Sequence, residues 1–237
     1  MNKKFNVPSD IDFLRILWCD NANIIRAKAL YKNSLKNSDF YLGISEAQQA
    51  ISTMGTVVNE SGLIPVGEVQ LQGDPKTFTS LSYASGYGYM MGDMLKDGKT
   101  WEYCPRGFLE KITQKASEMG FSVKASFENE FYLLKRDDDG IVPSDNTPFA
   151  SAHAMDINQE VIHDIVKALN QQGMEVQQYY PESGSGQQEI TIKYTDAKRA
   201  CDNQIRFRET EKGIAIKHGF IASFLPKIFP DQTGSGC

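Results

Sequence analysis

The sequence has 237 residues, of which 41% are hydrophobic and 23% charged, the balance of a globular protein with one large domain or two ordinary ones. A net charge of −5, with no local cluster of Lys and Arg, argues against a protein that binds nucleic acid. No apolar run approaches the length of a membrane span and no signal sequence opens the chain, so we expect a soluble, cytoplasmic protein without membrane association.

The first part of the chain favours β-structure, because apolar residues alternate or run together between clusters of turn residues. The expected elements are, in chain order, a strand at 9–19, a turn at 20–23, a strand at 24–30, a weak helix at 46–54, and strands at 63–71, 77–83 and 86–95. The first two strands predict a β-hairpin, and Gly73-Asp74-Pro75 predicts a break between two of the later ones.

From Pro105 onward the pattern changes to alternating helices and strands. The expected elements are a helix from Pro105 to Gly120, a strand at 123–135, a polar surface loop at 136–148, a helix at 156–173 with Asp156 as N-cap, strands at 174–180 and 188–194, a helix at 196–218 and a strand at 220–225. Hairpins followed by longer helical connections predict two domains of α+β character.

Two carboxylates stand two positions apart in the apolar strand of this second part, at Glu128 and Glu130. Positions i and i+2 of a strand face the same side, so these like charges repel unless a cation or a basic group lies between them. A solvated face of a half-covered sheet is the alternative interpretation of this pair.

A second acidic segment holds Glu182 and Glu189 around a Gly-rich turn that can approach a ligand closely. All four acids offer hard oxygen ligands, which suit Mg²⁺ or Mn²⁺ better than Zn²⁺ or Cu²⁺. The segments together favour a divalent-metal site over a merely solvated surface.

Three segments, Phe127–Leu134, Glu182–Glu189 and Ser223–Gly236, resemble in order and spacing three signature segments of the glutamine synthetase family. The opening residues Val7–Lys28 also resemble that family's N-terminal domain. The resemblance implies a small β-grasp-like domain over residues 1–104. It also implies the first part of a catalytic domain, with a curved antiparallel sheet and helices, over residues 105–237.

The resemblance implies a chemistry as well. Family members use ATP to phosphorylate the γ-carboxylate of glutamate, and ammonia or an amine then displaces phosphate. Glu130, Glu182 and Glu189 resemble the ligands of the metal that serves glutamate, and Glu128 resembles a ligand of the metal under the nucleotide phosphates. Gly234 resembles the family's glutamate-binding glycine, and no residue resembles a catalytic acid or base. Family members assemble into rings, so a homo-oligomer or an association with a longer chain is expected.

Two departures from the family pattern bear on the substrate. The family's asparagine beside the binding glycine is Thr233 here. An Asp-Gly-Ser-Ser segment that helps to bind ammonium in glutamine-forming members is absent, and Tyr41–Gln49 occupies its place. This pattern resembles the branch that joins glutamate to amines, so both ammonia and an amine remain possible acceptors.

The sequence stops at Cys237, before the family's His-containing metal segment and its substrate-clamping arginines. We therefore expect the isolated chain to be inactive or nearly so. Two further hypotheses stay open: a non-catalytic or regulatory subunit that joins full-length relatives, and a split enzyme completed by another chain. A generic two-metal hydrolase is the remaining alternative.

Overall fold

The computed structural model describes residues 5–35, 40–138 and 140–237. Residues 1–4 and 36–39 of the expected N-terminal domain, and residue 139 of the expected polar loop, therefore lie outside the described part. The chain divides into two compact units, Met1–Val123 and Lys124–Cys237. Each unit is taken by itself below.

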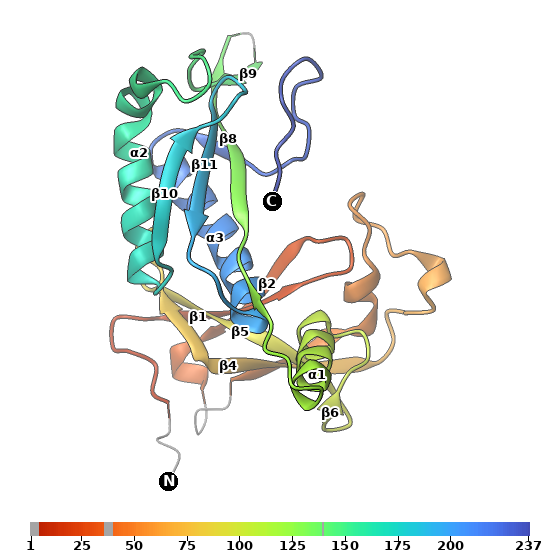
Figure 1. Ribbon diagram of the computed structural model, residues 1–237. Coiled ribbons are helices and arrows are strands. Elements are labelled where there is room, and N and C mark those ends of the chain that lie inside the picture. The colour runs from red at the N-terminus through yellow and green to blue at the C-terminus, as the bar shows by residue number, and fades with distance from the viewer. Residues whose placement is uncertain (1–4, 36–39, 139) are drawn as a thin grey trace. The chain divides into compact units, whose positions relative to one another are not determined.

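The first unit is built on a sheet with strand order β2-β1-β5-β4-β3, and β6 pairs with β5 (Figure 1). Its strands are β1 (Phe13–Cys19), β2 (Ile25–Tyr31), β3 (Tyr41–Ser45), β4 (Glu68–Ser80), β5 (Tyr87–Lys96) and β6 (Lys99–Thr100). The central pair β1–β5 is parallel and the other pairs are antiparallel. The predicted hairpin of β1 and β2 is confirmed, and the carboxylate of Asp20 closes its turn by accepting from Ala22 N, Ile24 N and Arg26 Nε.

Alternate residues of β1, among them Leu14, Ile16 and Trp18, are buried in the core of this unit. The expected weak helix at 46–54 is a 3-10 helix, η2 (Glu46–Ala50), and η1 (Lys32–Ser34) and η3 (Asn59–Ser61) are also 3-10 turns. Helix α1 (Pro105–Glu118) begins at the predicted proline, and the Cys104 sulfur caps it by accepting from Gly107 N. Helix α1 buries none of its residues.

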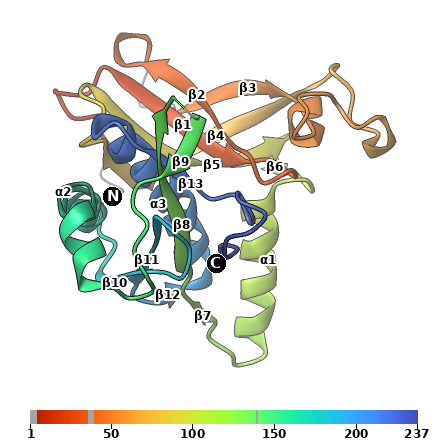
Figure 2. The same ribbon diagram turned by 90° about the horizontal axis from the view of Figure 1, so that it is seen from above.

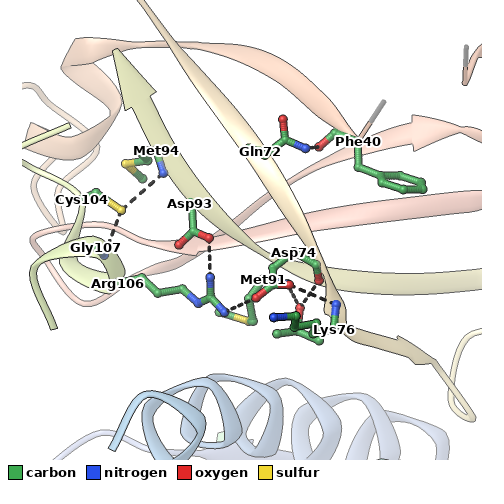
Figure 3. A network of polar contacts seen from close by, with 11 residues as sticks. Phe40, Gln72, Asp74, Lys76, Met91, Asp93, Met94, Cys104, Arg106 and Gly107 are labelled. Carbon is green, nitrogen blue, oxygen red and sulfur yellow. Dashed lines mark hydrogen bonds and ion pairs between the residues drawn. The ribbon is translucent and has the colours of Figure 1, made fainter. Parts of the chain in front are cut away.

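The expected break at Gly73-Asp74-Pro75 is wrong, because β4 continues through it. The register against β5 shifts between Asp74 and Thr79, and proline is tolerated at such an irregularity since no ladder hydrogen bond is required of it. Arg106 joins the two strands here: its guanidinium lies 2.7 Å from Asp74 Oδ2 on β4 and 2.6 Å from Asp93 Oδ2 on β5 (Figure 3).

The second unit contains an antiparallel sheet of order β10-β11-β8-β13, with β9 paired to β8, and a separate two-stranded ladder of β7 and β12. Its strands are β7 (Lys124–Ala125), β8 (Glu128–Asp137), β9 (Gly140–Pro143), β10 (Val176–Pro181), β11 (Gln187–Ile192), β12 (Thr195–Asp196) and β13 (Ile221–Ser223). The strand expected at 123–135 is therefore two strands. The prediction of a loop throughout 136–148 is also wrong, since β9 lies within it.

Helices α2 (Ala152–Gln171) and α3 (Ala197–Lys217) pack against each other beside this sheet (Figure 2). Asp196 caps α3 by accepting from Arg199 N. Asp156 does not cap α2, which begins four residues earlier after Ser151, because the intervening Ala-His-Ala-Met residues continue the helix without strain. On the helix side of the sheet, Phe131 of β8 and Phe207 of α3 both contact the ring of Phe224.

Both units combine a β-sheet with α-helices, which confirms the predicted α+β class. None of the helices in the described ranges is long and apolar enough to cross a bilayer. The opposite side of the β8–β11 sheet, away from Phe131, is the side that carries the acidic residues.

Candidate metal and substrate site

Strands β8 and β11 bring three of the four predicted acids to one sheet face. Glu189 pairs directly with Glu130, and Thr191 pairs with Glu128. Glu128 and Glu130 therefore lie on one side of β8, as their i, i+2 spacing predicts. Directly paired residues of an antiparallel ladder have Cβ atoms about 5 Å apart, so Glu130 and Glu189 are close neighbours.

Glu189 is the most buried acid of the group, with 5% of its surface exposed. Burial raises the pKa of its carboxyl, and the negative charges of Glu130, Glu182 and Glu128 act in the same direction. The hydroxyl of Tyr180, its cross-strand neighbour on β10, donates a 2.6 Å hydrogen bond to Oε2 and opposes this rise. That hydrogen bond raises the pKa of the Tyr180 phenol.

Glu182 follows β10 and opens the Gly-rich turn that leads into β11. Its Oε2 accepts from the backbone N–H and the hydroxyl of Ser183, at 2.9 and 3.2 Å. The turn requires glycine at two places. A Cβ on Gly184 would lie 2.0 Å from the Tyr132 hydroxyl oxygen, and Gly186 has φ +70° with the Leu133 carbonyl 2.8 Å from where its Cβ would be.

Glu130 is held by the C-terminal segment, residues 224–237, and by β11. Its Oε2 accepts from Gly236 N at 2.9 Å and from Gln187 Nε2 at 3.0 Å. Gln187 Nε2 also donates to the Gly234 carbonyl at 3.1 Å. The predicted substrate glycine therefore lies next to a predicted metal ligand, and a Cβ on Gly234 would come 2.8 Å from the Pro226 carbonyl.

The acids fit a divalent metal in the chemistry of their side chains. The donor set is all carboxylate, and the charges that act on Glu189 come from the other three acids. The described residues contain no group of three or more His, Cys, Asp or Glu side chains that could hold an ion as they stand. Glu130, Glu182 and Glu189 each accept their hydrogen bonds from nearby donors through Oε2.

Tyr180 and Gln187 are functional candidates that the sequence interpretation missed. Gln187 stands two residues before Glu189 on β11 and therefore shares its face, which is a signal available from sequence. The position of Tyr180 opposite Glu189 depends on the register of β10 against β11, which includes an irregularity between Val176 and Gln178. That register is not readable from local pattern.

The chain thus has a mixed α+β fold, with carboxylates on one sheet face beside a Gly-rich turn. The profile of the glutamine synthetase catalytic domain matches residues 102–237. The chain belongs to the glutamine synthetase family.

Similar proteins extend this relationship to the first unit. Type-1 glutamine synthetase 1 of Dictyostelium discoideum is 33% identical, over all of this chain and 52% of the relative. A crystal structure of a glutamine synthase homolog has a TM-score of 0.86 at 24% identity, covering 98% of this chain and 55% of the other. A GmaS complex with ADP has a TM-score of 0.83 at 23% identity, covering 95% and 51%. The chain spans about half the length of the curated relatives it matches.

Proposed function

We propose that this chain contributes the glutamate side of an ATP-dependent ligase site, in which glutamate is activated as γ-glutamyl phosphate and joined to ammonia or an amine. Glu130, Glu182 and Glu189 would hold one Mg²⁺ or Mn²⁺. Glu128, further along the same face of β8, would serve a second ion under the nucleotide phosphates. Such ions neutralise the charge of the transferring phosphoryl group and bring two anions together.

The observation that carries this proposal is the Glu130–Glu189 pair. Two acids placed directly opposite each other on neighbouring strands, one of them 5% exposed, repel each other when charged, and a divalent cation bound by both would relieve that repulsion. In a member of the glutamine synthetase family, such a cation would neutralise charge during phosphoryl transfer. Glu128, on the same face, is exposed, as a ligand of an ion under nucleotide phosphates would need to be.

The remaining residues of the site would position the amino-acid substrate. Gly234 has no side chain, so an amino-acid substrate could approach its backbone closely. The substrate's ammonium group would then lie near the carboxylate of Glu130. The Gly-rich turn lets the main chain pass close to the Tyr132 hydroxyl. We further propose that the catalytic part of the chain begins near Pro105 and that the chain works as a homo-oligomer or with a longer or complementary chain.

Equilibrium Mn²⁺ binding tests the site. We expect the chain to bind Mn²⁺ in competition with Mg²⁺, and glutamate to tighten that binding. Glu130→Gln and Glu189→Gln should weaken Mn²⁺ binding at least tenfold. Glu160→Gln, which neutralises an exposed acid of α2, is the matched control and should bind as the wild type does. Equal binding by all four proteins would refute the proposed site.

The reaction is tested by phosphate release from ATP with glutamate present and with ammonia or methylamine as acceptor. Release by the isolated chain that requires both glutamate and an acceptor supports the ligase, and it overturns the expectation that the isolated chain is inactive. The alternative is a non-catalytic or regulatory subunit that joins full-length relatives. Mn²⁺ binding without acceptor-dependent phosphate release, together with co-assembly with a full-length relative, would select that alternative.

A further inference from the structure

One buried amide contacts more parts of the site than any acid in it does. Gln187 is 1% exposed, and its Nε2 donates to Glu130 Oε2 at 3.0 Å, to the Gly234 carbonyl at 3.1 Å and to Ser235 Oγ at 3.4 Å. Its Oε1 accepts from Gly184 N at 2.9 Å. The side chain therefore joins β8, the Gly-rich turn and the C-terminal segment, whose end lies beside β8 (Figure 1).

The hydrogen bonds to Glu130 reach only one of its two carboxylate oxygens. The Gln187 amide and the Gly236 N–H both donate to the same carboxylate oxygen, Oε2. The other oxygen, Oε1, receives neither donor, and it is the atom nearest to where a Cβ on Gly236 would be, at 3.1 Å. A carboxylate fixed through one oxygen presents the other in a defined orientation, which is how hydrogen bonds outside the ligand set orient a metal ligand.

The C-terminal segment depends on the same group of contacts. Besides the Gln187 bond to Gly234, the Tyr132 hydroxyl donates to the Thr233 carbonyl, and Glu130 N donates to the Gly236 carbonyl at 3.4 Å. The exposed end of the segment is thus attached to β8 and β11 through a few polar contacts, of which Gln187 makes two.

We propose that Gln187 is a positioning residue that holds Glu130 and the Gly234–Gly236 backbone as one unit, so that divalent-metal binding and ordering of the C-terminal segment are linked. The inference rests on the proposed function and deepens it. A metal on Glu130 fixes the carboxylate that Gln187 and Gly236 contact, so the metal orders the segment. By reciprocity, an ordered segment strengthens metal binding by the same factor.

Gln187→Met removes the amide while keeping the length of the side chain, and Gln188→Met is its matched control. Gln188 is the next residue of β11 and is 0% exposed, and its Oε1 accepts from the Tyr179 hydroxyl, but it lies on the opposite face. Two readouts are taken on the whole chain: the affinity for Mn²⁺ alone, from the signal of free Mn²⁺ in electron paramagnetic resonance, and amide hydrogen exchange over residues 233–237 with and without Mn²⁺.

We expect Mn²⁺ to slow amide exchange in the wild-type segment. Gln187→Met should raise the exchange rates without metal, weaken Mn²⁺ binding by about 10- to 100-fold, and abolish the slowing. Gln188→Met should behave as the wild type in all three respects. A Gln187→Met protein with wild-type affinity and exchange overturns the inference while the metal site stands, and so does equal weakening by both methionine variants. A wild-type chain that does not bind Mn²⁺ refutes the proposed function and this inference together.

Discussion

The hydroxyl of Tyr180 on β10 donates a 2.6 Å hydrogen bond to Oε2 of Glu189, its directly paired neighbour on β11. The bond favours the charged form of Glu189, whose carboxyl is otherwise held toward the neutral form by burial and by the charges of Glu130, Glu182 and Glu128. The Tyr180 hydroxyl therefore opposes the rise in the pKa of Glu189 that burial and the three neighbouring carboxylates cause.

The first prediction follows from this bond. Tyr180→Phe removes the donor and should weaken Mn²⁺ binding about tenfold at neutral pH, because Glu189 then more readily holds a proton that the metal must displace. Tyr179→Phe is the control, since Tyr179 donates to Gln188 on the other face of the same strands. Calorimetric titration of both variants measures the difference. Identical Mn²⁺ affinities for the two variants would contradict the prediction.

The pH dependence of metal binding gives a second prediction. Because the pKa of Glu189 is raised, protons compete with a metal at a higher pH than for an ordinary glutamate. We expect the affinity for Mn²⁺ to fall as the pH is lowered through this raised pKa, approaching about tenfold per pH unit below it. Mn²⁺ titrations from neutral to acidic pH measure this. A wild-type affinity that stays constant down to the pKa of an ordinary glutamate would show that Glu189 is not a ligand.

A third prediction concerns Glu211 on α3, which is 0% exposed and whose two carboxylate oxygens have no hydrogen-bond partner among the described residues. Burial raises the pKa of this carboxyl well above its usual range. The folded protein then keeps a proton that the unfolded chain releases above about pH 4, so the free energy of unfolding falls as pH rises from there to the raised pKa.

Glu211→Gln should remove this slope, which is at most about 1.4 kcal/mol per pH unit, and should raise the melting temperature more at pH 8 than at pH 5. Glu209→Gln is the control on the same helix, because Glu209 is partly exposed and paired with Lys212. Thermal unfolding at the two pH values measures the effect. Parallel shifts of the Glu211→Gln and wild-type curves would rule out a buried proton.

The fourth prediction concerns the first unit. Arg106→Met removes the cation that Asp74 and Asp93 share (Figure 3), and we expect it to lower the free energy of unfolding by about 2 kcal/mol. The Arg106 side chain is only 10% exposed, so solvent screens the pair less than it screens a surface ion pair. Urea unfolding measures the change. Lys96→Met, which breaks the more exposed pair with Glu46, should leave the midpoint unaltered, and an equally small effect of Arg106→Met would contradict the account.

Local patterns predicted the parts of the fold that local chemistry controls. The period-two placement of Glu128 and Glu130 on one face, the hairpin of β1 and β2 and the extent of α3 all follow from residues within a few positions of each other. The change from hairpins to alternating helices and strands predicted the α+β class, and the structural comparisons confirm that class.

What the sequence could not predict depends on register and on tertiary packing. The continuity of β4 through Pro75 needs the irregular pairing with β5, and β9 forms only because β8 provides an edge for it. The contact of Gln187 with Glu130 and Gly234 joins residues 47 to 57 positions apart, so no local pattern could indicate it. The metal-ligand roles of the four acids stay predictions.

The most direct test is an anomalous difference map from crystals of this chain grown or soaked with Mn²⁺. The account predicts a peak on the acidic face of β8 and β11, with oxygens of Glu130, Glu182 and Glu189 about 2.1 to 2.2 Å from the ion. A Mn²⁺ bound elsewhere, or no peak on this face at saturating Mn²⁺, would contradict it.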